Sequence, residues 1–250
     1  MPVRLRLLRN VGLVLLVLLT AAPASAQVVQ SMHVGAGFVL PRGFDARDKD
    51  DVLIRNFLGE SLPAIPSRSD ALAFEISDFR TGQVFGEWNV AFGDFIEVGA
   101  GLGFYRKSVP TVYFDLVDES GLEIEQQLRL RVVPITGLVR FLPFGGPTDV
   151  QPYVGAGISI LNFQYTEAGD FVDGETLDVF PDRFRARGAT LGGLLLGGVR
   201  FPLGGDIYAF GIEGRYQFGT GNTGGLEEGF LADKIDLGAG QLNFTLLIRF

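Results

Sequence analysis

Apolar side chains in this chain recur at every second position and do not gather into long runs. The last nine residues, LNFTLLIRF, place an apolar side chain at each even-numbered position: Leu242, Phe244, Leu246, Ile248 and Phe250. A repeat of two is the spacing of side chains on one face of a β-strand. After residue 26 the chain has no unbroken run of the roughly 18 apolar residues that a membrane-spanning helix requires. The sequence therefore predicts a β-sheet with a continuous apolar face.

Eight segments carry this alternation, and we expect each to form a strand. They are Met32–Leu40, Val84–Phe92, Phe95–Tyr105, Val132–Leu142, Pro152–Gln164, Ala189–Phe201, Ile207–Phe218 and Ile235–Phe250. In the sixth segment Leu194 and Leu196 interrupt the polar face. The faces of the fifth segment stay unassigned, because its parity is ambiguous.

Short and long connections alternate between these expected strands. The long ones cover about 41–83, 106–131, 165–188 and 219–234. Within them, Asp48–Glu60 is a candidate short helix, and the DESG sequence at 118–121 predicts a hairpin turn that continues strands three and four. Regular alternation of short turns and long loops is typical of barrels that cross a bacterial outer membrane. The alternative, a soluble β-sandwich or lipocalin-like barrel, has no reason to separate loop lengths so regularly.

The first 26 residues have the three parts of a secretory signal peptide. Arg4, Arg6 and Arg9 are basic, Val11–Leu19 is apolar, and the small residues of the ASA sequence at 24–26 form a cleavage site before Gln27. A retained membrane helix is the alternative, but the apolar run is too short to span a bilayer. We therefore expect an exported chain whose mature domain is 27–250.

Charge and cysteine content narrow the function classes. Without the three arginines of segment 1–26, 18 basic residues face 29 acidic ones, a net charge of −11. That balance argues against nucleic acid as a partner, because phosphates need a basic surface. The chain has no cysteine, so it offers neither disulfides nor a thiol nucleophile. Together these features predict an all-β fold: an eight-stranded antiparallel up-and-down transmembrane β-barrel, preceded by a cleaved signal peptide.

The chain resembles the small outer-membrane β-barrel families, namely the barrel domain of outer membrane protein A and the OmpW and OmpX types. The resemblance covers 27–250, and its most specific element is the end of the chain. There, Leu242, Phe244, Leu246, Ile248 and Phe250 resemble the terminal signal that the barrel assembly machinery reads. The PYVGAG sequence at 152–157 also resembles a strand opening in these barrels. Nothing follows Phe250, so we do not expect the peptidoglycan-binding domain of the protein A family.

That resemblance implies a location and partners. The chain is expected in the bacterial outer membrane as a monomer, with its termini in the periplasm and its long loops outside. Its expected partners are outer-membrane lipid, lipopolysaccharide and the barrel assembly machinery.

Charged residues share the parity opposite to the apolar face, and we expect them inside the barrel. They are Glu87, Glu97, Arg140, Arg200, Glu213 and Arg215. An arginine that faced lipid at mid-depth would cost roughly 2–4 kcal/mol, whereas opposite charges inside an eight-stranded barrel can pair and fill it. The first interpretation is a polar plug that fixes the strand register, and the alternative is a gate.

Catalysis and metal binding have little support in the sequence. Ser31 and His33 lie on one parity and resemble the serine and histidine of lipid A deacylases and acyltransferases, but spacing nominates no acid partner. The acidic long loops contain no EF-hand spacing, so no metal or cofactor is expected. The first hypothesis is a structural or surface-interaction barrel that is closed to bulk solutes. The alternatives are a narrow channel for small or hydrophobic solutes, as in the OmpW type, and a lipid A-modifying enzyme.

Overall fold

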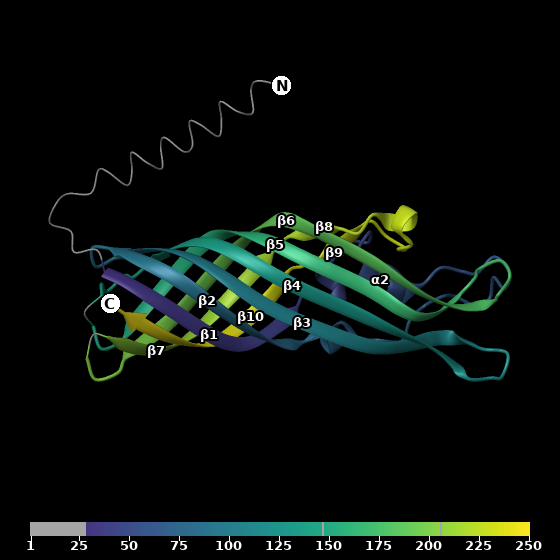
Figure 1. Cartoon of the computed structure of the whole chain (residues 1–250), viewed down its shortest axis with the longest axis horizontal. Coiled ribbons are helices and arrows are strands. Elements are labelled where there is room, and N and C mark those ends of the chain that lie inside the picture. Colours follow the sequence, from purple (N-terminus) through teal and green to yellow (C-terminus); the bar gives the residue numbers. More distant parts are fainter. Residues whose placement is uncertain (1–28, 147, 206) are drawn as a thin grey trace, which may run out of the picture.

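The computed structural model describes residues 29–146, 148–205 and 207–250, and in these ranges eight antiparallel strands close into a barrel (Figure 1). The predicted signal peptide lies outside the described residues. The barrel strands are β1 (Val29–Pro41), β2 (Thr81–Phe92), β3 (Ile96–Val117), β4 (Glu123–Phe141), β5 (Gln151–Val172), β6 (Val179–Pro202), β7 (Tyr208–Phe218) and β10 (Ala239–Arg249). The last strand, β10, pairs with β1 from Ser31↔Arg249 to Pro41↔Ala239, so the two ends of the sheet meet.

All eight predicted strands are present, and this fold confirms the all-β barrel that the alternation predicted. The eighth segment, Ile235–Phe250, is divided in the structure. Its first residues form the short strand β9 (Lys234–Asp236), which pairs with β8 (Thr220–Asn222), and β10 begins only at Ala239. Within the described ranges, no helix combines the length and the apolar character needed to cross a membrane.

The strands have two lengths. β1, β2, β7 and β10 have 11–13 residues, whereas β3, β4, β5 and β6 have 19–24. The four long strands continue past the others as a curved sheet (Figure 1), which we call the four-strand extension (106–117, 123–131, 162–172 and 179–190). The part in which all eight strands pair is the barrel section. The ranges 106–131 and 165–188, expected as loops, therefore consist mainly of strand, because the alternation continues through them.

Polarity inverts where the extension begins. On β4 the outward side chains of the barrel section are apolar, as at Val133 and Ile135, whereas Arg129 and Arg131 take the outward positions of the extension. The inward positions change in the opposite direction, from the buried Arg140 to the buried Leu128. The barrel section is thus apolar outside and polar inside, and the four-strand extension has the arrangement of an ordinary soluble sheet.

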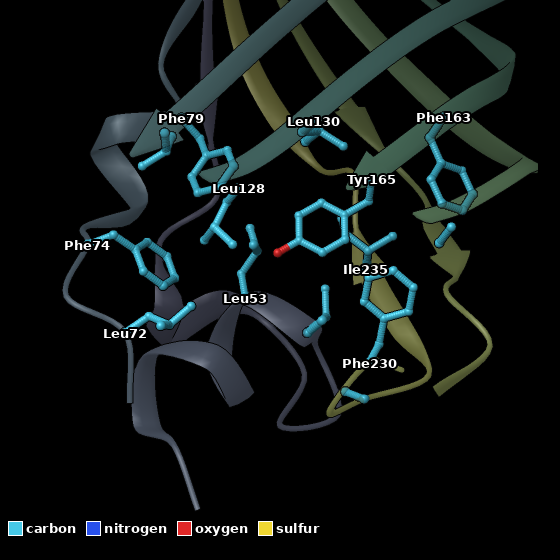
Figure 2. Packing of buried hydrophobic residues seen from close by; sticks show 14 of the residues in the cluster. Leu53, Leu72, Phe74, Phe79, Leu128, Leu130, Phe163, Tyr165, Phe230 and Ile235 are labelled. Atoms are coloured by element: carbon cyan, nitrogen blue, oxygen red, sulfur yellow. The ribbon is translucent and has the colours of Figure 1, made fainter. Parts of the chain in front are cut away.

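The concave side of the extension is filled by two segments, which we call the cap (42–80 and 219–238). The cap contains η1 (Phe44–Ala46), α2 (Val52–Leu58), η2 (Ile76–Phe79), β8, η3 (Gly225–Glu228) and β9. Leu53 of α2 and Phe230 lie against Leu128 and Tyr165 of the extension in one buried apolar core (Figure 2). The cap and the extension therefore form a hydrophobic core beyond one end of the barrel section.

The helix α2 confirms the candidate helix at 48–60, although it is shorter. It begins after Asp51, whose Oδ1 accepts a hydrogen bond from Leu53 N at 2.9 Å, the usual role of an N-cap aspartate. It ends at Gly59, where a φ of 65° places the backbone in the left-handed region that favours glycine. Residues 71–73 cover the free edge of β3, because Ala73 N donates to Val112 O and Phe114 N donates to Ala71 O.

Candidate functional site

The six charged residues that the alternation placed inward lie inside the barrel section, each less than one-tenth exposed: Glu87, Glu97, Arg140, Arg200, Glu213 and Arg215. We call this group the lumen cluster. It contains three carboxylates and three guanidiniums, so its formal charges sum to zero. They come from five strands, because inward positions at similar depth face one another across a narrow barrel.

Arg140 is the centre of the larger part of the cluster. Its Nη2 lies 2.5 Å from Glu87 Oε2 and 3.2 Å from Glu213 Oε2, and its Nη1 donates to Asn89 Oδ1 at 2.9 Å. Arg215 completes a ring, since its Nη2 is 2.7 Å from Glu87 Oε1 and its Nε donates to Glu213. Two carboxylates and two guanidiniums thus alternate around a closed circuit.

Arg200 and Glu97 form the second part. The two guanidinium nitrogens Nη1 and Nη2 donate to the two carboxylate oxygens at 2.7 and 2.9 Å, a bidentate pair. Tyr153 connects the two parts. Its hydroxyl donates to Glu213 Oε2 at 2.9 Å, and the centre of its ring lies 4.5 Å from the guanidinium carbon of Arg200.

Such a cluster fixes register more than it adds stability. Burying ions is expensive, and their mutual attraction compensates only when every member is paired. A slip of one strand by one residue would turn its charges outward and leave their partners alone. The cluster therefore favours one alignment of β2, β3, β4, β6 and β7 over its neighbours.

Three further residues join this site: Asn89, which has the predicted inward parity, and His33 and Tyr153, which the sequence did not assign to the cluster. His33 Nδ1 lies 3.4 Å from Glu87 Oε2 and 3.3 Å from Arg140 Nη2. Its inward parity was visible in the sequence, as was that of Asn89, but parity gives no information on which strands face each other. Tyr153 was missed because the parity of its strand was ambiguous.

The structure also supplies the acid partner that spacing could not nominate for Ser31 and His33. That residue is Glu87, but its carboxylate is bound by Arg140 and Arg215. Ser31 and His33 are both buried on the inward face of β1. A lipid-modifying site must meet acyl chains, and these side chains face away from the apolar exterior.

A small cavity lies beside the lumen cluster inside the barrel section. This cavity of about 20 Å³, bounded by Glu87, Phe85 and Arg215 among others, is large enough for about one water molecule. Toward the cap, Gln83 Nε2 donates to Gln241 Oε1 at 3.0 Å and to Asn243 Oδ1 at 2.6 Å. Beyond these amides lies the apolar core of the cap and extension.

The five residues of the expected terminal signal lie on the outer face of β10 or just after it. Four of them are more than one-third exposed, namely Leu242, Phe244, Leu246 and Phe250, and Ile248 is half-buried. Ile248 has the same parity. Phe250 N donates to Gln30 O at 3.0 Å, and its ring centroid is 5.0 Å from that of Trp88. The first and last described segments therefore meet at the end of the barrel opposite the cap (Figure 1).

No protein family model matches the sequence, and no curated protein sequence matches it. Among solved structures, the outer membrane protein OprG from Pseudomonas aeruginosa is similar over 90% of this chain and 97% of that chain, at 12% identity and a TM-score of 0.47. Neisserial surface protein A is similar over 89% of this chain and 97% of its own, at 9% identity and a TM-score of 0.42. The N-terminal β-barrel domain of Pseudomonas aeruginosa OprF covers 90% of this chain at 11% identity and a TM-score of 0.35.

Proposed function

We propose that this chain is an outer-membrane β-barrel that is closed to bulk solutes and acts through its cap as a structural or surface-interaction protein. The main support is that the outward side chains of the long strands change from apolar in the barrel section to polar in the extension. Hydrocarbon has no partner for a backbone N–H or C=O, so a sheet in a bilayer must close on itself and present an apolar exterior. The barrel section does both, whereas the extension has a polar exterior suited to water.

The orientation follows from which end carries the cap. The first described residue, Val29, and Phe250 lie at the opposite end, and small barrels of this type keep their termini in the periplasm. The cap and the four-strand extension would then project from the cell surface, where they offer the larger and more variable contact area. The outward residues of β10 are available to the barrel assembly machinery before β10 pairs with β1.

Conductance across a planar bilayer tests the closed lumen. The purified barrel should produce no stable current steps, because the lumen cluster and the apolar core each obstruct the axis. A variant in which a short turn replaces residues 42–80 separates the two obstructions. Val39 and Thr81 are paired neighbours, so a turn can join β1 to β2 directly.

This shortened variant should also stay silent, because the lumen cluster alone fills the barrel section. A steady current through the intact chain would overturn the closed barrel and favour the channel. A current through the shortened variant alone would identify the cap as the closing element. A shift of the folded band on a gel after heating shows in each case that the barrel has formed.

A further inference from the structure

Six arginines gather on the outer wall of the four-strand extension, and we call them the arginine belt: Arg106, Arg129, Arg131, Arg183, Arg185 and Arg187. The strand register places them in rows. Arg106 pairs with Arg131, which pairs with Gln164, which pairs with Arg187, so three arginines share one row across β3 to β6. The next row contains Arg129 and Arg185 on either side of Thr166.

Among the described residues, no acidic side chain forms an ion pair with a member of this belt. Arg129 is held along the wall by neutral partners, since its Nε donates to Ser108 Oγ at 3.0 Å and its Nη2 to Gln127 Oε1 at 2.6 Å. The guanidinium carbon of Arg131 lies 5.6 Å from the centre of the Phe104 ring, the last outward apolar side chain of β3 before Arg106. Five of the six arginines are exposed and Arg129 is half-buried, so their charge is available to a ligand.

The belt occupies one narrow level of the molecule. Arg106 is two residues from Phe104 and Arg131 is two residues from Val133, a step of about 7 Å along each strand. On β4 and β5 the outward positions on the other side of the belt become acidic, at Glu123, Glu125 and Asp170. Basic charge is thus confined between an apolar band and an acidic tip.

Neither solubility nor protection of an edge strand accounts for this arrangement of apolar, basic and acidic levels. Solubility is served by charge of either sign, and the tip of the same strands is acidic. Arginine on an exposed edge strand discourages pairing with other chains, which suits β6, but Arg129 and Arg131 lie on β4, which is paired on both sides. The opposite end of the barrel is also different, since its three turns (93–95, 142–150 and 203–207) contain no lysine or arginine.

We propose that the arginine belt binds the phosphorylated headgroups of outer-leaflet lipid, with the acyl chains of the same lipid against the apolar band below. The planar guanidinium matches a phosphate with two parallel hydrogen bonds. A ligand that contacts both the arginine belt and the apolar band must be an amphiphile with an anionic head. Because only one end of the barrel carries such a belt, the arrangement suits a bilayer whose two leaflets differ in their lipids. The inference rests on the membrane orientation of the proposed function and gives that surface a ligand class.

Binding of diphosphoryl lipid A in neutral detergent tests the proposal, with bound lipid counted by native mass spectrometry. The test variant is Arg131→Gln with Arg187→Gln, in one row of the belt. The control is Lys49→Gln with Arg68→Gln, which removes the same charge from exposed cap residues. Each basic residue beside an anionic surface is worth roughly a factor of five, so the test variant should bind about 25-fold more weakly and the control as the unaltered chain does.

Lipid A without phosphates should bind the unaltered chain at least as weakly as diphosphoryl lipid A binds the test variant, because it offers none of the six arginines a phosphate. Equal affinity of the test and control variants for diphosphoryl lipid A, whether high or low, would overturn the proposal that the arginine belt binds the lipid headgroup. Fluorescence of Trp88, the sole tryptophan, separates this failure from a failure of the proposed function. If lipid binding fails but the emission is shifted to the blue in phosphatidylcholine vesicles, the proposed membrane barrel stands and only lipid binding by the arginine belt is rejected. Water-like emission would reject both proposals.

Discussion

The barrel section and the four-strand extension are built from the same strands, yet they place opposite residues inside and outside. In the barrel section the interior contains a balanced set of ions beside a small apolar cluster, and the exterior is apolar. In the extension the interior is packed leucine, phenylalanine and tyrosine, and the exterior is arginine, glutamine and glutamate. A strand therefore does not have a fixed buried face. The medium outside the sheet, lipid or water, determines whether the outward or the inward side chains are apolar. One long strand can cross from the first medium into the second.

The largest effect should come from the interior of the barrel section. Arg140→Met leaves Glu87 and Glu213 buried with less compensating charge, and losing one partner of a buried ion pair costs roughly 3–5 kcal/mol. We expect the free energy of unfolding, measured with urea in detergent micelles, to fall by that amount. Arg68→Met, at an exposed cap position, should change it by less than about 0.5 kcal/mol. Equal losses of unfolding free energy in the two variants would show that the ion pairs of Arg140 contribute no more to stability than an exposed arginine does.

The interior of the extension should respond to lost packing. Leu128 is fully buried, and truncation of such a leucine to alanine typically costs about 2–5 kcal/mol. Gln127→Ala, one residue away on the outer face, should be nearly neutral in the same urea titration. If both variants unfold alike, the extension has no core of its own.

The two exteriors can be compared on a single strand. Ile135→Arg puts a guanidinium on the lipid face of β4 and should cost roughly 2–4 kcal/mol when the chain folds into phosphatidylcholine vesicles. Gln127→Arg makes the same kind of change on the outer face of the extension and should cost close to nothing. Equal losses of folding free energy at the two positions, whether large or small, would contradict our placement of the boundary between lipid and water at Arg131.

The smallest effect should be a pH dependence of the cap. Burial raises the pKa of Glu167 to about 7, although a hydrogen bond from Asn56 Nδ2 at 2.5 Å opposes the shift. The folded protein therefore keeps a proton that the unfolded chain loses near its ordinary pKa of 4.5. The free energy of unfolding should fall by up to about 3 kcal/mol as the pH rises from about 4.5 to about 7.

Glu167→Gln retains the oxygen that accepts from Asn56 and removes the titration. Hydrogen exchange of the α2 amides across this pH range should slow at acid pH in the unaltered chain, beyond the intrinsic effect of pH, and the variant should lack that extra protection. An unchanged pH dependence in the variant would assign the effect to another group.

Most of the barrel section could be predicted from the sequence, because each strand there keeps one parity for its apolar side chains. The structure places all six charged residues inside, as that parity indicated. Their partners could not be predicted, since Arg140 and Glu213 lie 73 positions apart and meet only because the barrel is narrow. The same limit applies to His33, whereas Tyr153 could not be assigned because the parity of its strand was ambiguous.

The extension was harder to predict because its alternation reverses. On β5 the outward Ile160 is followed directly by the inward Leu161, so apolar residues occupy both parities within one segment. That reversal is the physical reason for the ambiguous faces of Pro152–Gln164. On β6, Leu194 and Leu196 interrupt the polar face because they pack inside the barrel with Leu138 and Tyr153. The cap depends on contacts between distant segments and leaves almost no signal in the pattern.

The balance of charge in the lumen cluster has an electrical consequence. A potential across a membrane does work on net charge that moves through it, about 2.3 kcal/mol per elementary charge for each 100 mV. Three carboxylates locked to three guanidiniums carry no net charge, so a small displacement of the cluster as a unit would transfer none. The interior of this barrel should therefore be insensitive to voltage, even though it is one of the most densely charged parts of the molecule.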